Sequence, residues 1–228
     1  MRFFKHATSV GLGLVLSLAA GSSASADRYE LGIGGGTHFV PMESMDSVSE
    51  KRGFGVVSLH AGVKLPELPL LSGFQSELVL NWDFGELGGT TFNRIDTDLE
   101  VDAIVASGRL RRELWGPISA FGDAGLGVQW ASLRLSDNLS SASRPLTGDA
   151  KSMLSSLGGG ADVRVVDTPI VRMALRVQAN YVAATSMHFD ATPMSAGEDV
   201  LEIDTRSSEL GSINTTGLVL KAGFFGSF

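Results

Sequence analysis

Residues 171–181 read Val-Arg-Met-Ala-Leu-Arg-Val-Gln-Ala-Asn-Tyr, with apolar side chains at every odd position and mostly polar ones between. Successive side chains of a β-strand point to opposite faces, so this spacing predicts a strand with one apolar face and one polar face. The polar face carries Arg176, Gln178 and Asn180. The stretch therefore indicates a strand that lies between two different environments.

The same alternation recurs along the chain and predicts eight strands in all. One of them, 99–112, is irregular, because its apolar residues change from odd positions (Leu99, Val101) to even ones (Ala106, Leu110). A β-bulge would produce this change of face, and so would a strand that begins later than residue 99. The register of this strand therefore stays open. The alternating stretches are 29–39, 57–65, 74–84, 99–112, 120–130, 153–165, 171–181 and 218–228.

The connections between these strands are expected to be alternately long and short. The short ones contain turn residues, as in Trp115-Gly116-Pro117 and Asp167-Thr168-Pro169. Up-and-down barrels of outer membranes have long external loops and short periplasmic turns. We therefore predict an all-β fold, an eight-stranded antiparallel up-and-down transmembrane β-barrel with both termini on the periplasmic side. The expected connections are 41–53, 66–73, 86–97, 113–117, 136–151, 167–169 and 186–212.

The alternative is a soluble ligand-binding barrel, which would point its apolar face inward. The polar faces of the predicted strands combine many glycines with charges of both signs, such as Glu77 and Arg176. This combination fits a narrow lumen, because paired charges offset each other's desolvation. Aromatic residues such as Trp82, Trp130 and Tyr181 lie near strand ends on the apolar face, as in the interfacial girdles of membrane barrels. We therefore expect the apolar face to contact lipid.

The first 26 residues have the pattern of a signal peptide. Arg2 and Lys5 precede an apolar run over 10–20, and Ala24-Ser25-Ala26 supplies a small-residue cleavage site. We therefore expect residues 1–26 to be removed on export and residues 27–228 to form one outer-membrane barrel domain.

Composition excludes several classes of function. The 228-residue chain has no cysteine, which excludes disulfides, thiol nucleophiles and cysteine-based zinc sites. Its formal net charge of −7 argues against a nucleic-acid-binding surface, which would need clustered lysines and arginines.

Two stretches resemble known outer-membrane proteins. Residues 218–228 look like the C-terminal signal of outer-membrane barrels, and residues 116–128 resemble the fifth strand of small eight-stranded barrels of the OmpA/OmpX-like superfamily. The resemblance implies insertion into the outer membrane of a Gram-negative bacterium by the barrel-assembly machinery. That machinery would read the final strand through Leu220, Phe224 and Phe228.

Few residues suggest catalysis. Ser58 and His60 share one face of a strand, as in half of a barrel-embedded lipid A-modifying enzyme, but no acid partner is identifiable and ordinary lumen polar groups have the same spacing. The glycine runs 34–36 and 158–160 are followed by strands, whereas a phosphate loop needs a helix N-terminus. We therefore predict no catalytic, cofactor-binding or metal-binding residues.

The charged residues of the polar faces are expected to meet inside the barrel. Eight strands leave an interior just wide enough for side chains, so these charges would form a salt-bridged plug, with a narrow channel for ions or small solutes as the alternative. The sequence does not say which acid pairs with which base. The predicted lumen cluster is Glu77, Asp123, Asp162, Arg109, Arg164, Arg172 and Arg176.

The leading functional prediction is a non-enzymatic structural or surface-interaction role, with a channel second and a lipid A-modifying enzyme third. The expected partners are outer-membrane lipid and lipopolysaccharide, the barrel-assembly machinery during biogenesis, and a surface ligand at the connections 41–53, 136–151 and 186–212. The last connection is rich in acids, which fits either divalent-cation binding or a solvated loop.

Overall fold

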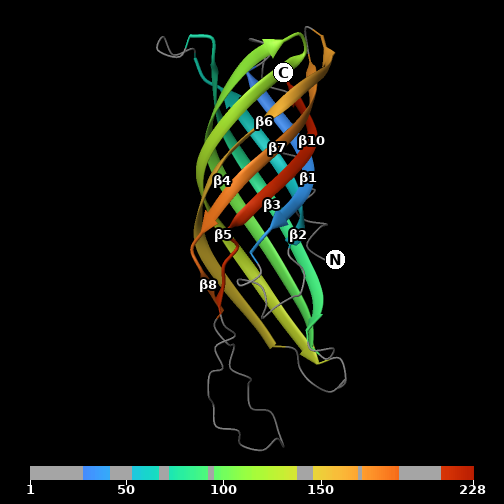
Figure 1. Ribbon diagram of the computed structural model, residues 1–228, viewed down its shortest axis with the longest axis vertical. Coiled ribbons are helices and arrows are strands. Elements are labelled where there is room, and N and C mark those ends of the chain that lie inside the picture. The colour runs from blue at the N-terminus through green and yellow to red at the C-terminus, as the bar shows by residue number, and fades with distance from the viewer. Residues whose placement is uncertain are drawn as a thin grey trace, which may run out of the picture.

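The computed structural model describes residues 28–41, 53–66, 72–91, 95–137, 146–168, 171–189 and 212–228. Eight of its strands close into one antiparallel barrel, which confirms the predicted fold class, and two short strands form a separate sheet (Figure 1). The predicted signal peptide lies outside the described residues. The barrel strands are β1 (Tyr29–Phe39), β2 (Gly53–Lys64), β3 (Gln75–Thr91), β4 (Ile95–Trp115), β5 (Ile118–Asp137), β6 (Leu146–Asp167), β7 (Arg172–Ala184) and β10 (Gly217–Ser227). The short sheet pairs β8 (Met187–His188) with β9 (Ser212–Ile213).

Each barrel strand pairs with its neighbours in sequence, and β1 closes the barrel against β10. Backbone hydrogen bonds of 3.0 and 3.1 Å join Tyr29 and Phe228, so the start of β1 and the end of β10 lie at the same end. The tight turn between β4 and β5 is also at this end, where Gly116 has a positive φ of 53°, as the first position of a two-residue hairpin turn often requires. We call this the turn end and the opposite one the loop end. No helix in the described part of the chain is long and apolar enough to span a bilayer.

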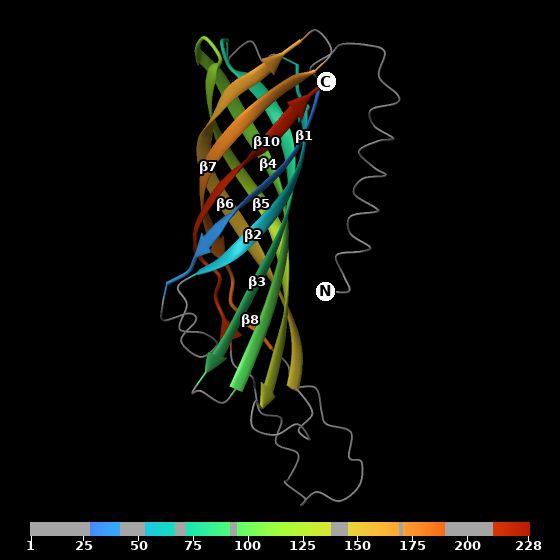
Figure 2. The same ribbon diagram turned by 90° about the vertical axis from the view of Figure 1, so that its right-hand side faces the viewer.

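The strands differ in length. β1, β2, β7 and β10 have 11 to 13 residues, whereas β3, β4, β5 and β6 have 17 to 22. A tilted strand needs about 9–11 residues to cross a bilayer. The four long strands therefore continue well beyond that length at the loop end, where Figure 2 shows them reaching past the other four. We call this part the extension; it comprises residues 85–91, 95–101, 131–137 and 146–150.

The extension corrects two of the expected connections. Residues 86–97 and 136–151 were expected to be loops, but β3 continues to Thr91 and β4 starts at Ile95, while β5 continues to Asp137 and β6 starts at Leu146. Within 186–212, strand β8 was not expected either. The expectation was wrong because the outer face of these strands carries polar instead of apolar residues beyond Phe84 and Trp130, so the alternation there was interpreted as irregular structure.

The change of apolar face in β4 has the same origin, and neither explanation offered from sequence holds. β4 is paired with β5 without interruption from Ile95 to Glu113, and the one register shift lies between Glu113 and Trp115. Leu99, Val101, Val105 and Arg109 are all buried on the inner side of this regular strand. The backbone keeps its alternation, and the environments on its two faces change instead.

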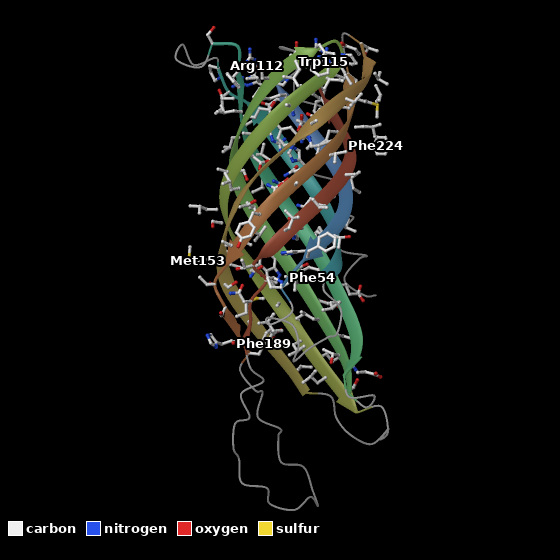
Figure 3. All side chains as sticks on the ribbon, in the orientation of Figure 1. Phe54, Arg112, Trp115, Met153, Phe189 and Phe224 are labelled. Atoms are coloured by element: carbon white, nitrogen blue, oxygen red, sulfur yellow. The ribbon has the colours of Figure 1, made fainter. Side chains whose placement is uncertain are left out.

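The outer surface shows this change directly. In the half of the barrel next to the turn end, which we call the turn half, it is apolar. Leu126, Leu157 and Val177 are 65–71% exposed there, and Figure 3 shows Phe224 and Met153 on the outside. The extension is polar outside. Phe84 and Trp130 flank Asp102 in the sheet and mark the boundary on β3 to β5. The exposed polar residues of the extension include Glu86, Asp98, Glu100, Ser132, Arg134 and Asp149.

The interior of the extension is an apolar core. Leu99 and Leu133 of the long strands are at most 1% exposed. They pack with Met187 of β8, Ile213 of β9 and Phe189, so the short β8–β9 sheet covers the inner face of the extension. Burial of such side chains stabilises this end by about 1.5–3 kcal/mol each.

Candidate functional site

The turn half of the barrel encloses a cluster of charged side chains. Seven of the eight barrel strands supply them from their inward-facing positions, and β10 adds the ring of Phe225. We call this group the ionic cluster. Its members are Glu30 (β1), His60 (β2), Glu77 (β3), Arg109 and Arg111 (β4), Asp123 (β5), Asp162 (β6) and Arg176 (β7).

Arg176 contacts one carboxylate of the cluster at two points. Its guanidinium donates two parallel hydrogen bonds to Asp162, from Nε at 2.6 Å and from Nη2 at 3.0 Å. Nη2 also lies 2.8 Å from Oε1 of Glu30. Arg176 is 2% exposed, and such two-point contacts are the strongest form of arginine–carboxylate pairing.

The two arginines of β4 connect the remaining acids. Arg109 Nη2 donates to Asp123 at 3.1 Å, and its Nη1 lies 3.5 Å from Glu30 and 3.9 Å from Glu77. Arg111 lies 2.7 Å from Glu30, 3.2 Å from Glu77 and 3.1 Å from Asp162. Every carboxylate of the cluster therefore contacts at least one arginine, which offsets the cost of burying these charges.

Two aromatic rings pack against the arginines. The guanidinium of Arg176 lies 3.8 Å from the ring centre of Phe225 and 4.9 Å from that of Phe121, which Arg109 also contacts at 4.2 Å. Glycine makes room for the Phe225 ring, because a Cβ at Gly32 would lie 2.2 Å from that ring. Arginine over an aromatic face is favourable, so the rings fix the guanidinium positions as well as filling space.

The structure brings together five of the seven predicted lumen residues: Glu77, Asp123, Asp162, Arg109 and Arg176. The other two, Arg164 and Arg172, lie at the rim of the turn end. Arg164 is paired there with Glu113 at 2.7 Å and Asp167 at 2.8 Å, and Arg172 is paired with Asp167 at 2.9 Å.

The prediction missed three members, Glu30, Arg111 and His60. A signal for them existed, since Glu30 and His60 lie on the polar faces of their strands and Arg111 shares the face of Arg109. Sequence could not show how deep each side chain lies, because depth depends on strand tilt and register.

Ser58 and His60 both face the interior but have different partners. Ser58 Oγ donates to Asp83, and Lys221 Nζ contacts the same carboxylate at 2.6 and 2.7 Å. The ring of His60 lies 2.8 Å from Glu30 and 2.9 Å from Asn81. Neither side chain faces the outer surface that a membrane lipid would contact.

Between the ionic cluster and the apolar core lies a short polar layer. Gln129 donates 2.7 Å hydrogen bonds to Ser152 and Thr215, and Asn180 donates to Asp123 at 2.7 Å. A cavity of about 50 Å³ remains here, which is room for very few waters. On either side of this cavity, the described interior is occupied by the side chains of the ionic cluster and of the apolar core.

The residues of the predicted assembly signal lie on β10 and at the turn end. Leu220 and Phe224 of β10 are 43% and 57% exposed on the outer apolar surface, and Phe228 pairs with Tyr29 at the turn end. Most of the predicted ligand-binding connections, 42–52, 138–145 and 190–211, lies outside the described residues. Within the described ranges, no group of three or more histidine, aspartate or glutamate side chains is arranged to hold a metal ion.

Comparison with known proteins bears on the fold. No protein-family description and no curated protein matches this sequence. Neisserial surface protein A (NspA) is 13% identical over 87% of this chain and 95% of its own, with a TM-score of 0.44. Ail, the attachment invasion locus protein of Yersinia pestis, is 10% identical over 90% and 97%, with a TM-score of 0.40.

A major outer membrane protein from Thermus thermophilus superposes better. It is 14% identical over 90% of this chain and 100% of its own, with a TM-score of 0.52. At this identity the similarity establishes the fold and not the activity. The chain thus has the fold of a small eight-stranded outer-membrane β-barrel.

Proposed function

We propose that this chain is a non-enzymatic outer-membrane barrel that is closed to solutes and holds its extension at the cell surface as a contact surface. The observation that carries the proposal is the filled interior. The ionic cluster occupies the turn half, and the apolar core with β8 and β9 occupies the half next to the loop end, which we call the loop half. Either alone would obstruct a pore, and together they close both halves.

The outer surface supports the membrane location. Large apolar side chains are exposed around the turn half, whereas in water such a surface would favour aggregation. Closure of the sheet leaves no unpaired strand edge in this half, as a bilayer requires. The leader-like residues 1–26 and the terminal strand with Leu220, Phe224 and Phe228 fit export and assembly into the outer membrane.

The extension supports the surface role. Its four-stranded wall continues past the aromatic boundary at Phe84 and Trp130, at the level of lipopolysaccharide head groups or beyond. Its outer face is mostly acidic, with Glu86 directly opposite Glu100. Strands β5 and β6 of this wall are joined by residues 138–145. We expect a surface ligand to bind at this connection and at those within 41–53 and 186–212, since such loops are where barrels bind partners.

Planar-bilayer recording tests the closed lumen. We expect the wild-type protein to give no conductance above that of the bare bilayer, and Arg176→Ala to give none either, because the apolar core still closes the loop half. Stable current steps from the wild type would contradict the proposal and favour the narrow channel. In that case Glu77→Ala should increase the step size.

Two further measurements test the location and the absence of catalysis. In the outer-membrane fraction, unheated and boiled samples should migrate differently on a denaturing gel, since a closed barrel resists detergent until it is heated. Mass spectra of lipid A from cells with and without the protein should be the same. A soluble protein or an altered lipid A would refute the corresponding part of the proposal.

A further inference from the structure

The turn end of the barrel contains an open vestibule that the proposed function does not use. Its volume is about 790 Å³, within the range of small-molecule pockets. Five cationic and three acidic side chains line it. The cations are Arg28, Lys64, Arg111, Arg164 and Arg172, and the acids are Glu30, Glu113 and Asp162.

Side chains close the floor of the vestibule, and the charged ones among them form ion pairs with one another. Arg111 lies there, 2.7 Å from Glu30 and 3.1 Å from Asp162. These side chains belong to the ionic cluster, and the other members of the cluster fill the lumen beneath them. The vestibule is therefore open at the turn end and closed at its floor, so it can hold a ligand without leading into a channel.

Two arginines at the rim of the vestibule are also paired with carboxylates. Arg164 is paired with Glu113 and Asp167, and Arg172 is paired with Asp167. These contacts hold the two guanidinium groups at the rim, where they contribute to the electrostatic potential inside the vestibule. A guanidinium keeps donors free after one carboxylate contact, since it has five N–H groups.

At β1 and β2, the vestibule carries two cations, Arg28 and Lys64, that have no partner among the described residues. They lie on neighbouring chain segments, joined by a 2.9 Å hydrogen bond from the Lys64 amide to the Arg28 carbonyl. Neither side chain forms an ion pair or a side-chain hydrogen bond with another residue in the described ranges. Both side chains line the vestibule, so the charge there that is not paired within the described residues is positive and lies on one wall.

We propose that this vestibule binds a small molecule with two or more carboxylate or phosphate groups, held by Arg28 and Lys64. Such anions match the donors available, because a guanidinium binds carboxylate and phosphate at two points and an ammonium adds a point charge. The walls exclude part of the surrounding water, which strengthens these contacts relative to those on an open surface. The inference goes beyond the proposed function and does not depend on it, since the folded barrel forms the vestibule whatever its surface role is.

Calorimetry on the folded protein in detergent at low ionic strength tests the inference, with citrate as the carboxylate probe and pyrophosphate as the phosphate probe. We expect at least one probe to bind and its affinity to fall with added salt. The double variant Arg28→Gln/Lys64→Gln should weaken binding by at least about tenfold, because it removes two charge-assisted contacts.

A matched control separates this site from general attraction to positive charge. Arg134→Gln/Lys151→Gln removes the same two residue types from exposed positions on the outer face near the loop end, and should leave the affinity unchanged within about twofold. An equal loss in both double variants, or no binding of either probe to the wild type, would overturn the inference. Binding of only one probe assigns the ligand to that chemistry, and heat-dependent gel mobility verifies that each variant is folded.

Discussion

In the turn half of β5, Leu126 faces outward and Asp123 faces inward, whereas in the loop half of the same strand Leu133 faces inward and Arg134 faces outward. The exposed fraction is 71% for Leu126 and 1% for Leu133, although both are leucines of one regular strand. The difference shows that each half places its apolar side chains where water is absent. In the turn half that place is the outer surface, where the proposed bilayer lies, and in the loop half it is the barrel's own interior.

The two halves also differ in what holds them together. The turn half depends on ion pairs and hydrogen bonds inside the barrel, which have to be nearly complete to be favourable. The loop half depends on ordinary apolar packing, in which a deletion costs roughly the contact that it removes. Substitutions in the two halves should therefore fail for different reasons, and four comparisons can show this.

The largest effect is expected from Arg176→Met. This substitution keeps the apolar stem but leaves Asp162 without its two-point partner, so the free energy of unfolding should fall by about 3–5 kcal/mol. Urea unfolding in detergent measures it. Arg172→Met is the control on the same strand, because its exposed pair with Asp167 should contribute less than about 1 kcal/mol. Equal losses of unfolding free energy for the two variants would show that a buried ion pair of the ionic cluster stabilises the protein no more than an exposed pair.

Leu133→Ala tests the loop half. Truncation of this fully buried side chain should lower the free energy of unfolding by about 2–5 kcal/mol, through lost packing and a residual cavity. The neighbouring Ser132→Ala, on the exposed outer face, should change it by less than about 0.5 kcal/mol. If Leu133→Ala were as harmless as Ser132→Ala, the extension would not contain a packed core.

A charge introduced on the outer face locates the boundary between the halves. Leu126→Arg places a cation in the apolar band and should destabilise the protein in lipid vesicles by about 2–4 kcal/mol. Ser132→Arg lies on the same face of the same strand, directly opposite Glu100, and should be neutral within about 0.5 kcal/mol. Similar costs at both positions would mean that the two outer surfaces meet the same environment.

The smallest effect is expected from Gly32→Ala. The new methyl group would overlap the ring of Phe225, and the displacement of that ring from Arg176 should cost about 1–3 kcal/mol of unfolding free energy. Gly55→Ala is the matched control, since a Cβ there would have no atom within 4 Å. A neutral Gly32→Ala would show that the cluster adapts more easily than its close packing suggests.

The sequence predicted strands from alternation, and it predicted a barrel with a polar lumen and an apolar outer face from the lengths of the connections, the composition of the polar faces and the positions of the aromatic residues. It failed where the environment changed along a strand, as at Leu99 and Val101, because a period of two says that faces alternate but not which solvent each face meets. It also failed for β8 and β9, since their short sequences contain no repeated pattern. Glu30 and Arg111 were missed because the depth of a side chain depends on register, which one sequence does not determine.

Cysteine accessibility along β5 tests the central claim most directly, because the chain contains no cysteine of its own. Single cysteines at 126, 128, 132, 133 and 134 would be treated with a membrane-impermeant maleimide in lipid vesicles. We expect positions 132 and 134 to react, 126 and 128 to be protected by lipid, and 133 to be protected by the apolar core. In detergent solution, denaturation by heat should expose all five. Equal reactivity of 126, 128, 132 and 134 in vesicles would contradict the account, because the outer face of the strand would then meet a single environment.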